Sequence, residues 1–134
     1  MRSMLIIFAG SLVAVAACKK SGSGSSSIGG KGGSAVMVVS PEHHGDFVDT
    51  CTIYIKYNAQ DAPANGVYDD SVACVLNDTI PVAIFPGLKQ GNYYLYGVGY
   101  HAIYSPPNVK GGKSCTITSN DTTQEYLPTY TYIP

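Results

Sequence analysis

This 134-residue chain has three histidines, and they are the first candidates for metal ligands. His43 and His44 follow Glu42, and His101 ends a long run of β-forming residues. A closed zinc or copper site needs three or four ligands that converge on one point. If residues 43 and 44 lie in a strand, their side chains point to opposite faces. We therefore predict no metal site and expect the histidines to serve packing or turns.

The acidic pair Asp69 and Asp70 is the candidate for a calcium site, with Asp61 or Asp78 nearby. A calcium loop alternates oxygen ligands around a glycine, and that spacing is absent, so solvated loop carboxylates are the simpler interpretation. The chain also has no G-x-S-x-G, H-E-x-x-H or paired-carboxylate pattern that would supply catalytic groups. We therefore predict a non-enzymatic protein that uses no cofactor.

Tyrosine is frequent, and all 11 tyrosines follow residue 50. In the run 92–101, Tyr94, Tyr96 and Tyr100 share one face of the predicted strand, and Tyr93 lies on the other. A stripe of aromatic rings can form a platform for a carbohydrate, a small ligand or a peptide. The alternative is a sheet face half covered by a neighbouring strand, which is the more common arrangement.

Cys18 stands in a different setting from the other three cysteines. Residues 15–18 read Val-Ala-Ala-Cys and end an uncharged, mostly apolar run that is too short to span a bilayer as a helix. Arg2 supplies the positive charge at the start of an export signal. The junction resembles a bacterial lipobox, which implies cleavage before Cys18 and attachment of a diacylglycerol to its sulfur. Plain secretory cleavage at the same small residues is the alternative.

The lipobox resemblance implies several acyl chains on the mature protein, enough for stable attachment to a membrane surface. Lys19 stands where an aspartate signals inner-membrane retention in some Gram-negative bacteria. We therefore expect an envelope lipoprotein of the outer membrane, with its periplasmic or surface orientation left open. We expect it to act as a structural or protein-interaction module of the envelope. The alternative is a lipoprotein that binds a small ligand or a glycan on the face of Tyr94, Tyr96 and Tyr100. Its partners are the membrane, through Cys18, and an envelope protein or a glycan.

The remaining cysteines, Cys51, Cys74 and Cys115, are odd in number and allow at most one disulfide. The cell envelope is oxidising and permits such a bond. Cys51 shares a predicted strand face with Ile53 and Ile55, where a free thiol acts as a small hydrophobic group. We expect buried free thiols, with one disulfide as the alternative.

Three short motifs resemble the O-glycosylation sites of some Gram-negative bacteria, in which Asp precedes Ser or Thr and then a methyl-bearing residue. They give Ser71, Thr79 and Thr122 as candidate acceptors. Thr79 follows Asp78 in a predicted turn and is the best placed of the three.

The charge distribution argues against a nucleic-acid partner. The chain has 8 basic and 9 acidic residues, a net charge of −1. All acidic residues but only four of the lysines lie after residue 34, so residues 35–134 carry −5. The only arginine is Arg2, and phosphate recognition needs a basic footprint that the rest of the chain lacks.

The chain divides into three parts by composition. Residues 1–17 are the predicted lipoprotein signal peptide, and residues 18–34 are the lipidated cysteine and a tether rich in glycine and serine. Such a composition cannot bury enough apolar surface to become ordered, and we expect an end-to-end distance of about 20–25 Å. Residues 35–134 form the predicted folded domain.

The folded part reads as short runs of β-forming residues separated by turn residues. Period-two alternation is clearest in 51–57, and no window shows a helical period. Pro81 is expected to place its strand at an edge or a bulge. About seven strands in this length indicate an all-β, two-sheet sandwich. The predicted strands are 35–40, 51–57, 71–76, 79–85, 92–101, 114–118 and 125–133.

A family resemblance rests on the segments PEHHG (41–45), TIYIKY (52–57), VYDDS (67–71), GLKQGNYYLYGVGY (87–100) and VKGG (109–112). Together they resemble a family of small bacterial lipoproteins with a prealbumin-like domain, similar to transthyretin and to the regulatory domain of carboxypeptidases. The resemblance covers about residues 36–118 and implies an Ig-like sandwich of seven strands. Residues 46–50, Cys51 and His101 depart from the family pattern. The family has no established chemistry, so the resemblance implies a fold and no activity.

Overall fold

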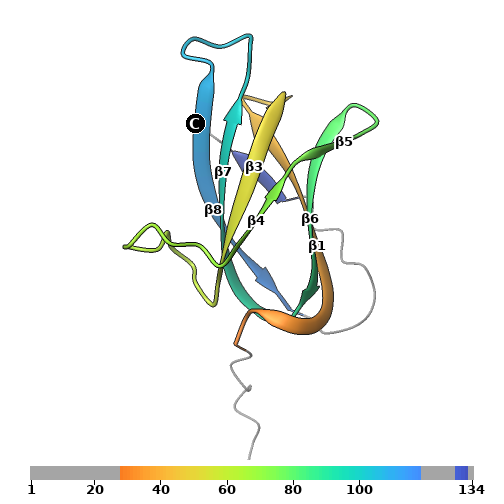
Figure 1. Ribbon diagram of the computed structural model, residues 1–134, viewed down its shortest axis with the longest axis vertical. Coiled ribbons are helices and arrows are strands. Elements are labelled where there is room, and N and C mark those ends of the chain that lie inside the picture. Colours follow the sequence, from red (N-terminus) through yellow and green to blue (C-terminus); the bar gives the residue numbers. More distant parts are fainter. Residues whose placement is uncertain (1–27, 119–128, 133–134) are drawn as a thin grey trace, which may run out of the picture.

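The computed structural model describes residues 28–118 and 129–132, and their regular structure is entirely β. The described strands are β1 (Lys31–His43), β2 (Asp46–Phe47), β3 (Thr50–Tyr57), β4 (Asp70–Ala73), β5 (Val75–Asn77), β6 (Ile80–Leu88), β7 (Gly91–Tyr100), β8 (Asn108–Ile117) and β9 (Thr129–Tyr132). They form two sheets that face each other (Figure 1), which confirms the predicted two-sheet sandwich. Within these ranges there is no helix of the length and apolarity needed to cross a membrane.

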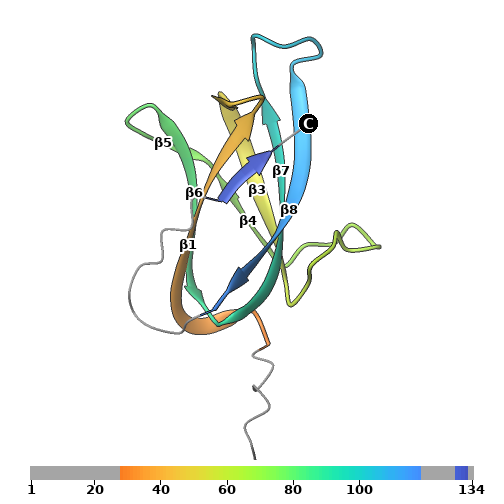
Figure 2. The same cartoon turned by 180° about the vertical axis from the view of Figure 1, so that it is seen from behind.

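The two sheets differ in their strand pairing. One has the order β4-β3-β7-β8, and all its neighbours are antiparallel. The other has the order β2-β1-β6-β5, and β9 pairs in parallel with residues 39–42 of β1. Figure 2, the view from behind, shows β9 lying along β1. The first of these sheets, built on β3 and β7, carries the candidate binding face described below.

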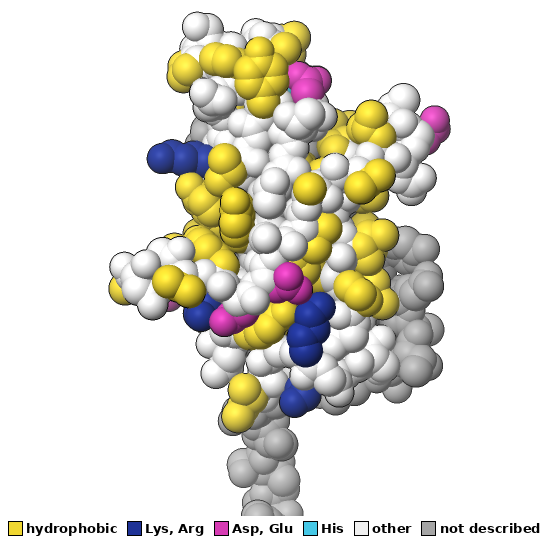
Figure 3. All heavy atoms as spheres, in the orientation of Figure 1, with side chains coloured by type: hydrophobic (Ala, Val, Ile, Leu, Met, Phe, Trp, Pro, Cys, Tyr) yellow, Lys and Arg dark blue, Asp and Glu magenta, His cyan; other side chains and the backbone are white. Residues whose placement is uncertain are grey.

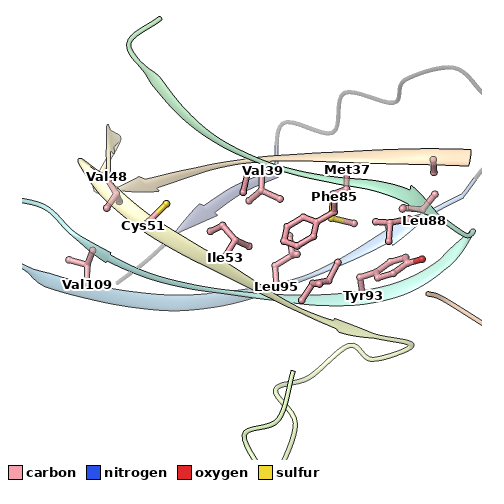
Figure 4. Packing of buried hydrophobic residues seen from close by; sticks show 14 residues of the cluster. Met37, Val39, Val48, Cys51, Ile53, Phe85, Leu88, Tyr93, Leu95 and Val109 are labelled. Atoms are coloured by element: carbon pink, nitrogen blue, oxygen red, sulfur yellow. The ribbon is translucent and has the colours of Figure 1, made fainter. Parts of the chain in front are cut away.

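The core lies between the sheets because alternate residues of each strand point inward. Figure 4 shows Met37 and Phe85 from one sheet meeting Ile53 and Leu95 from the other. All four side chains are fully buried. The alternation predicted for residues 51–57 is confirmed: the odd-numbered residues of β3 line the core, and the even-numbered residues face outward.

The segment 71–76, predicted as one strand, divides at Cys74. Before it, β4 pairs with β3 in one sheet; after it, β5 pairs with β6 in the other. The Cys74 amide donates a hydrogen bond of 2.9 Å to the Cys51 carbonyl. The chain therefore changes sheets at Cys74 without an intervening loop.

This crossover brings two cysteines together. Cys51 and Cys74 form a disulfide, with their Cα atoms 5.5 Å apart. The expectation of free thiols is therefore wrong for this pair, because the change of sheet turns Cys74 toward the inner face of β3. Cys115 is free and half-buried, with its sulfur 3.7 Å from that of Met37. Burial raises the pKa of the Cys115 thiol to about 11.

The sandwich begins before the predicted boundary at residue 35. Gly29 and Gly30 are buried, and β1 starts at Lys31. A Cβ atom on Gly29 would lie 2.7 Å from the Asn92 carbonyl oxygen, so only glycine fits there. The Lys89 amide donates a hydrogen bond of 2.8 Å to the Gly30 carbonyl. Residues 28–34, expected to be the end of the tether, are therefore part of the folded unit.

Pro81 does not lie on an edge strand, because β6 pairs with β1 on one side and with β5 on the other. The paired residues of β1 and β6 end at Val39 and Ala83, before Pro81 is reached. The proline therefore sits beyond the end of that ladder, where its missing N–H leaves no gap in the pairing with β1.

Candidate binding face

Four tyrosines lie together on the outer face of the β4-β3-β7-β8 sheet: Tyr54, Tyr68, Tyr94 and Tyr96. We name this surface the tyrosine face. Tyr54 of β3 pairs with Tyr96 of β7, and Ser71 and Gly112 continue the same row on either side. Lys56 pairs with Tyr94 in the next row. Because paired residues of antiparallel strands point to the same face, these side chains are neighbours on one surface.

Three rings of the tyrosine face, those of Tyr54, Tyr68 and Tyr96, form a continuous aromatic surface. Tyr68 stacks on Tyr96, with ring centroids 5.7 Å apart and planes inclined by 14°. The ring of Tyr54 lies beside both. Its centroid is 5.7 Å from that of Tyr68 and 6.5 Å from that of Tyr96, with interplanar angles of 49° and 45°. All three side chains are half-buried. The aromatic surface is therefore packed against itself and still open to solvent.

Tyr68 belongs to the loop between β3 and β4. Hydrogen bonds of the next residue, Asp69, hold the end of this loop against β3. The Asp69 amide donates to the Ile55 carbonyl at 2.9 Å. Its carboxylate accepts hydrogen bonds from the Tyr57 amide at 2.7 Å and from the Lys56 ammonium at 3.0 Å. These bonds hold the loop against the end of β3 and direct Tyr68 onto the sheet.

Gly112 makes room for the ring of Tyr94. A Cβ atom at residue 112 would overlap the Tyr94 hydroxyl and ring carbons. A glycine at this position of β8 therefore lets the Tyr94 ring lie flat across the neighbouring strand.

A shallow depression of about 350 Å³ adjoins the rings. It is lined by Tyr54, Gly66, Tyr68, Asp69, Asp70 and Ser71. Both carboxylates at its rim have a lysine partner: Lys56 lies 3.0 Å from Asp69, and Lys31 lies 3.5 Å from Asp70. On the face seen in Figure 3, acidic (magenta) and basic (dark blue) side chains lie close together among hydrophobic (yellow) ones.

Burial and charge shift the pKa values around the depression in two directions. Burial tends to raise the pKa of Asp69, but the hydrogen bonds from the Tyr57 amide and from Lys56 outweigh it and lower the value. Burial, followed by the charges of Asp70 and Asp69, raises the pKa of Tyr57 to about 12. Burial also raises the pKa of Tyr68. At neutral pH Asp69 is therefore ionised, and the hydroxyls of Tyr57 and Tyr68 are neutral.

The predicted stripe of Tyr94, Tyr96 and Tyr100 lies on one face, with Tyr93 buried opposite, and this placement is confirmed. Tyr100, however, is separated from the other two by Val98. It lines a second depression, of about 420 Å³, beside the Cys51–Cys74 disulfide. The aromatic cluster therefore contains Tyr94 and Tyr96 together with Tyr54 and Tyr68, and Tyr100 belongs to another part of the surface.

The histidines converge at one end of the sandwich, contrary to the expectation that His43 and His44 point apart. β1 ends at His43, and His44 has a φ of 53° in the turn before β2. The two rings are 4.2 Å apart, and the ring of His101 lies 5.9 Å from that of His43. Tyr104 packs against all three rings. The rule for strand side chains fails here because His44 is a turn residue.

His43 and His101 are only 5% and 3% exposed, and the Nδ1 atom of each is buried without a hydrogen bond. Burial, and then the charges of His44 and His101, lower the pKa of His43. In the part of the chain that the structure describes, no three His, Cys, Asp or Glu side chains are arranged to hold a metal ion.

The predicted modification sites have different outcomes. Ser71 is exposed on β4 and lines the depression beside Tyr54. Thr79 is exposed in the turn between β5 and β6, as expected. Thr122 and the predicted lipidation site Cys18 lie outside the described residues. Modification at these positions stays a prediction.

Comparisons with protein-family models, with curated proteins and with solved structures find no match to this chain. The prealbumin-like resemblance therefore stays a prediction, and the geometry of the chain itself carries the functional argument.

Sequence reasoning missed two of the four tyrosines in the cluster. Tyr54 could have been found, because the alternation of residues 51–57 already places it on the face opposite Ile53. Tyr68 carries no such signal, since it precedes β4 in a loop. Its place depends on the hydrogen bonds of Asp69, which join residues far apart in the sequence.

Proposed function

We propose that the protein is an envelope lipoprotein, anchored through Cys18, whose β-sandwich is a non-enzymatic binding module. The single observation that carries the binding role is the tyrosine face. A cluster of half-buried aromatic rings beside a polar depression is the arrangement that ligand sites use, with apolar surface for contact and a few polar groups for orientation.

The arrangement of charged groups favours binding over catalysis. The depression has two carboxylates, and each is already paired with a lysine. No histidine or thiol lines it. A general base or a nucleophile needs a neighbouring group that activates it, and the lining supplies none.

A protein partner is the second candidate, and the β5–β6 hairpin is the observation that favours it. Val75 and Leu76 are 68% and 63% exposed, and Ile80 and Ile84 are also exposed on the neighbouring strand. Figure 3 shows yellow side chains over this part of the molecule. Apolar groups on a short edge strand suit contact with another protein.

The experiment is chemical crosslinking in intact cells that express the full chain. We expect adducts with an envelope component that disappear in a Tyr54→Ala/Tyr96→Ala variant and persist in a Tyr100→Ala variant. A Val75→Ser/Leu76→Ser variant tests the second candidate in the same way. Adducts that survive in all three variants would contradict a binding role for either surface.

The anchor has its own test. Cys18→Ser should abolish incorporation of a labelled fatty acid and move the protein out of the membrane fraction. Retention of both the label and the membrane position in this variant would overturn the lipoprotein assignment.

A further inference from the structure

We propose that the depression on the tyrosine face binds an uncharged saccharide, whose sugar rings lie against Tyr54 and Tyr68 and whose hydroxyls bond to the groups of residues 69–71. This inference rests on the proposed binding role and adds the chemical class of the ligand. The proposal is based on an aromatic surface, on polar groups that can accept further hydrogen bonds, and on a local charge that sums to zero.

The aromatic surface suits a ring with apolar C–H groups on its face. Tyr68 stacks on Tyr96 and thereby has one ring face fixed and supported by the sheet. Tyr54, beside it, lines the floor of the depression. The two rings are 5.7 Å apart and inclined by 49°, so they form a shallow corner instead of a flat surface. A sugar ring placed in this corner contacts both aromatic rings at once.

The polar groups suit hydroxyls. Ionised carboxylate oxygens offer about four acceptor positions per group, so a carboxylate that already binds a lysine still accepts further hydrogen bonds. Asp69 uses its two oxygens for Lys56 and the Tyr57 amide, and Asp70 accepts from the Ser71 amide at 2.8 Å. Within the described residues, the hydroxyls of Tyr54 and Tyr68 form no hydrogen bond.

The charge around the depression selects against charged ligands. Lys56 neutralises Asp69, and Lys31 neutralises Asp70, so the two carboxylates leave no net charge. A charged ligand would have to give up hydration without gaining an unpaired counter-charge. An uncharged ligand with many hydroxyls avoids that cost and keeps the contacts with the rings.

The scaffold of the site is already ordered. β3 and β7 are the two inner strands of their sheet, and the loop that carries Tyr68 is held by the three hydrogen bonds of Asp69. Little conformational entropy is therefore lost when a ligand binds. Because the depression is shallow and covers one side of a sugar, we expect dissociation constants of about 0.1–1 mM.

The test uses the purified full-length protein in detergent and calorimetric titration with defined hexasaccharides. The uncharged probes are cellohexaose, maltohexaose and chitohexaose. The charged comparisons are chitosan hexamer, which has the chitohexaose backbone with amines, and hexagalacturonate. We expect at least one uncharged probe to bind, and chitosan hexamer to bind less tightly than chitohexaose.

Variants locate the site. Tyr68→Ala should weaken binding about tenfold or more because it removes one wall of the corner, and Tyr68→Phe should keep most of the affinity because the stacked ring remains. Tyr100→Ala, on the same sheet but in the second depression, is the matched control and should bind normally. Circular dichroism of each variant checks that the sandwich is intact.

The inference is overturned if none of the uncharged probes binds at about 10 mM, if charged probes bind more tightly, or if Tyr68→Ala leaves the affinity unchanged. In those cases crosslinks that depend on Tyr54 and Tyr96 would still support a binding module, and its ligand would be a protein. If the protein binds no saccharide and also gives no crosslinks that depend on Tyr54 and Tyr96, both proposals are contradicted.

Discussion

The inner and outer faces of β7 carry the same side chain in two different settings. Tyr93 is fully buried, and its hydroxyl accepts a hydrogen bond of 2.8 Å from the Gly30 amide and donates one of 2.6 Å to the Lys89 carbonyl. Its neighbour Tyr94 and the next outward residue, Tyr96, are half-buried on the outer face, and Tyr96 contacts the rings of Tyr54 and Tyr68. The inward tyrosine packs in the core with its hydroxyl hydrogen-bonded, whereas the outward tyrosines leave their hydroxyls available to a ligand.

This contrast shows how one residue type serves stability and recognition on a single strand. A buried hydroxyl must be paired, and that of Tyr93 has hydrogen-bond partners in Gly30 and Lys89. An outward ring gains from contact with its neighbours and keeps surface for a ligand. We therefore expect substitutions on the inner face to change the free energy of unfolding, and substitutions on the outer face to change binding.

The largest expected effect compares Leu95 with Tyr96. Leu95→Ala should lower the free energy of unfolding by about 3–4 kcal/mol, because Leu95 is fully buried in the core and leaves a cavity. Tyr96→Ala should cost less than about 1 kcal/mol. Urea unfolding followed by circular dichroism measures both values. Equal losses would show that the outer rings are part of the folding core.

Removal of the disulfide should have the next largest effect. Cys51 and Cys74 are separated by 23 residues, and opening a loop of that length costs about 3 kcal/mol in the chain-entropy description. Cys51→Ala/Cys74→Ala should unfold at lower urea concentration and should no longer respond to reductant. Cys115→Ala is the control and should respond to reductant like the parent protein. Three titratable thiols in the unreduced, denatured parent chain would contradict the bond.

A smaller effect isolates the hydroxyl of Tyr93. Tyr93→Phe should cost about 1–2 kcal/mol, because it removes the acceptor of the buried Gly30 amide and the donor to the Lys89 carbonyl. Tyr96→Phe, the matched change on the outer face, should leave unfolding unchanged. If both substitutions are neutral, the two faces do not differ in their use of the hydroxyl.

The smallest expected effect is a dependence of stability on pH from the histidine cluster. The pKa of His43 in the folded protein lies below its ordinary value of 6.5, so the unfolded chain takes up a proton first as the pH falls. Stability is therefore complete above pH 6.5 and decreases from there down to the folded pKa. The melting temperature should be lower at about pH 5.5 than at about pH 7.5. His43→Gln should reduce this difference, and an unchanged difference would exclude His43 as its source.

The sequence predicted the sandwich, and it predicted which side chains of β3 and β7 point to the core, because period-two alternation is a local property of a strand. It did not predict the division of residues 71–76 between two sheets, since every residue there is a plausible strand residue. The disulfide follows from that division, and the sequence offered it only as the alternative to free thiols. Alternation also failed at His44, where the turn before β2 replaced the expected strand.

The candidate site was predicted in part for the same reason. Tyr94 and Tyr96 follow from the parity of one strand, but their neighbours depend on which strands pair and in what register. Tyr54 meets Tyr96 only because β3 pairs with β7 at that register. Tyr68 joins them through a loop held by Asp69, and no spacing in the sequence encodes such a long-range contact.

The bond between the Gly30 amide and the Tyr93 hydroxyl has a mechanical consequence. Gly30 immediately precedes β1, and Tyr93 belongs to β7 in the opposite sheet. A pull on the chain ahead of Gly30 is therefore passed to both sheets at the same point, and does not peel β1 away from β6 alone. If the chain is anchored at Cys18 and holds a ligand on the tyrosine face, tension runs from Gly30 through Tyr93 into β7, the strand that carries Tyr94 and Tyr96.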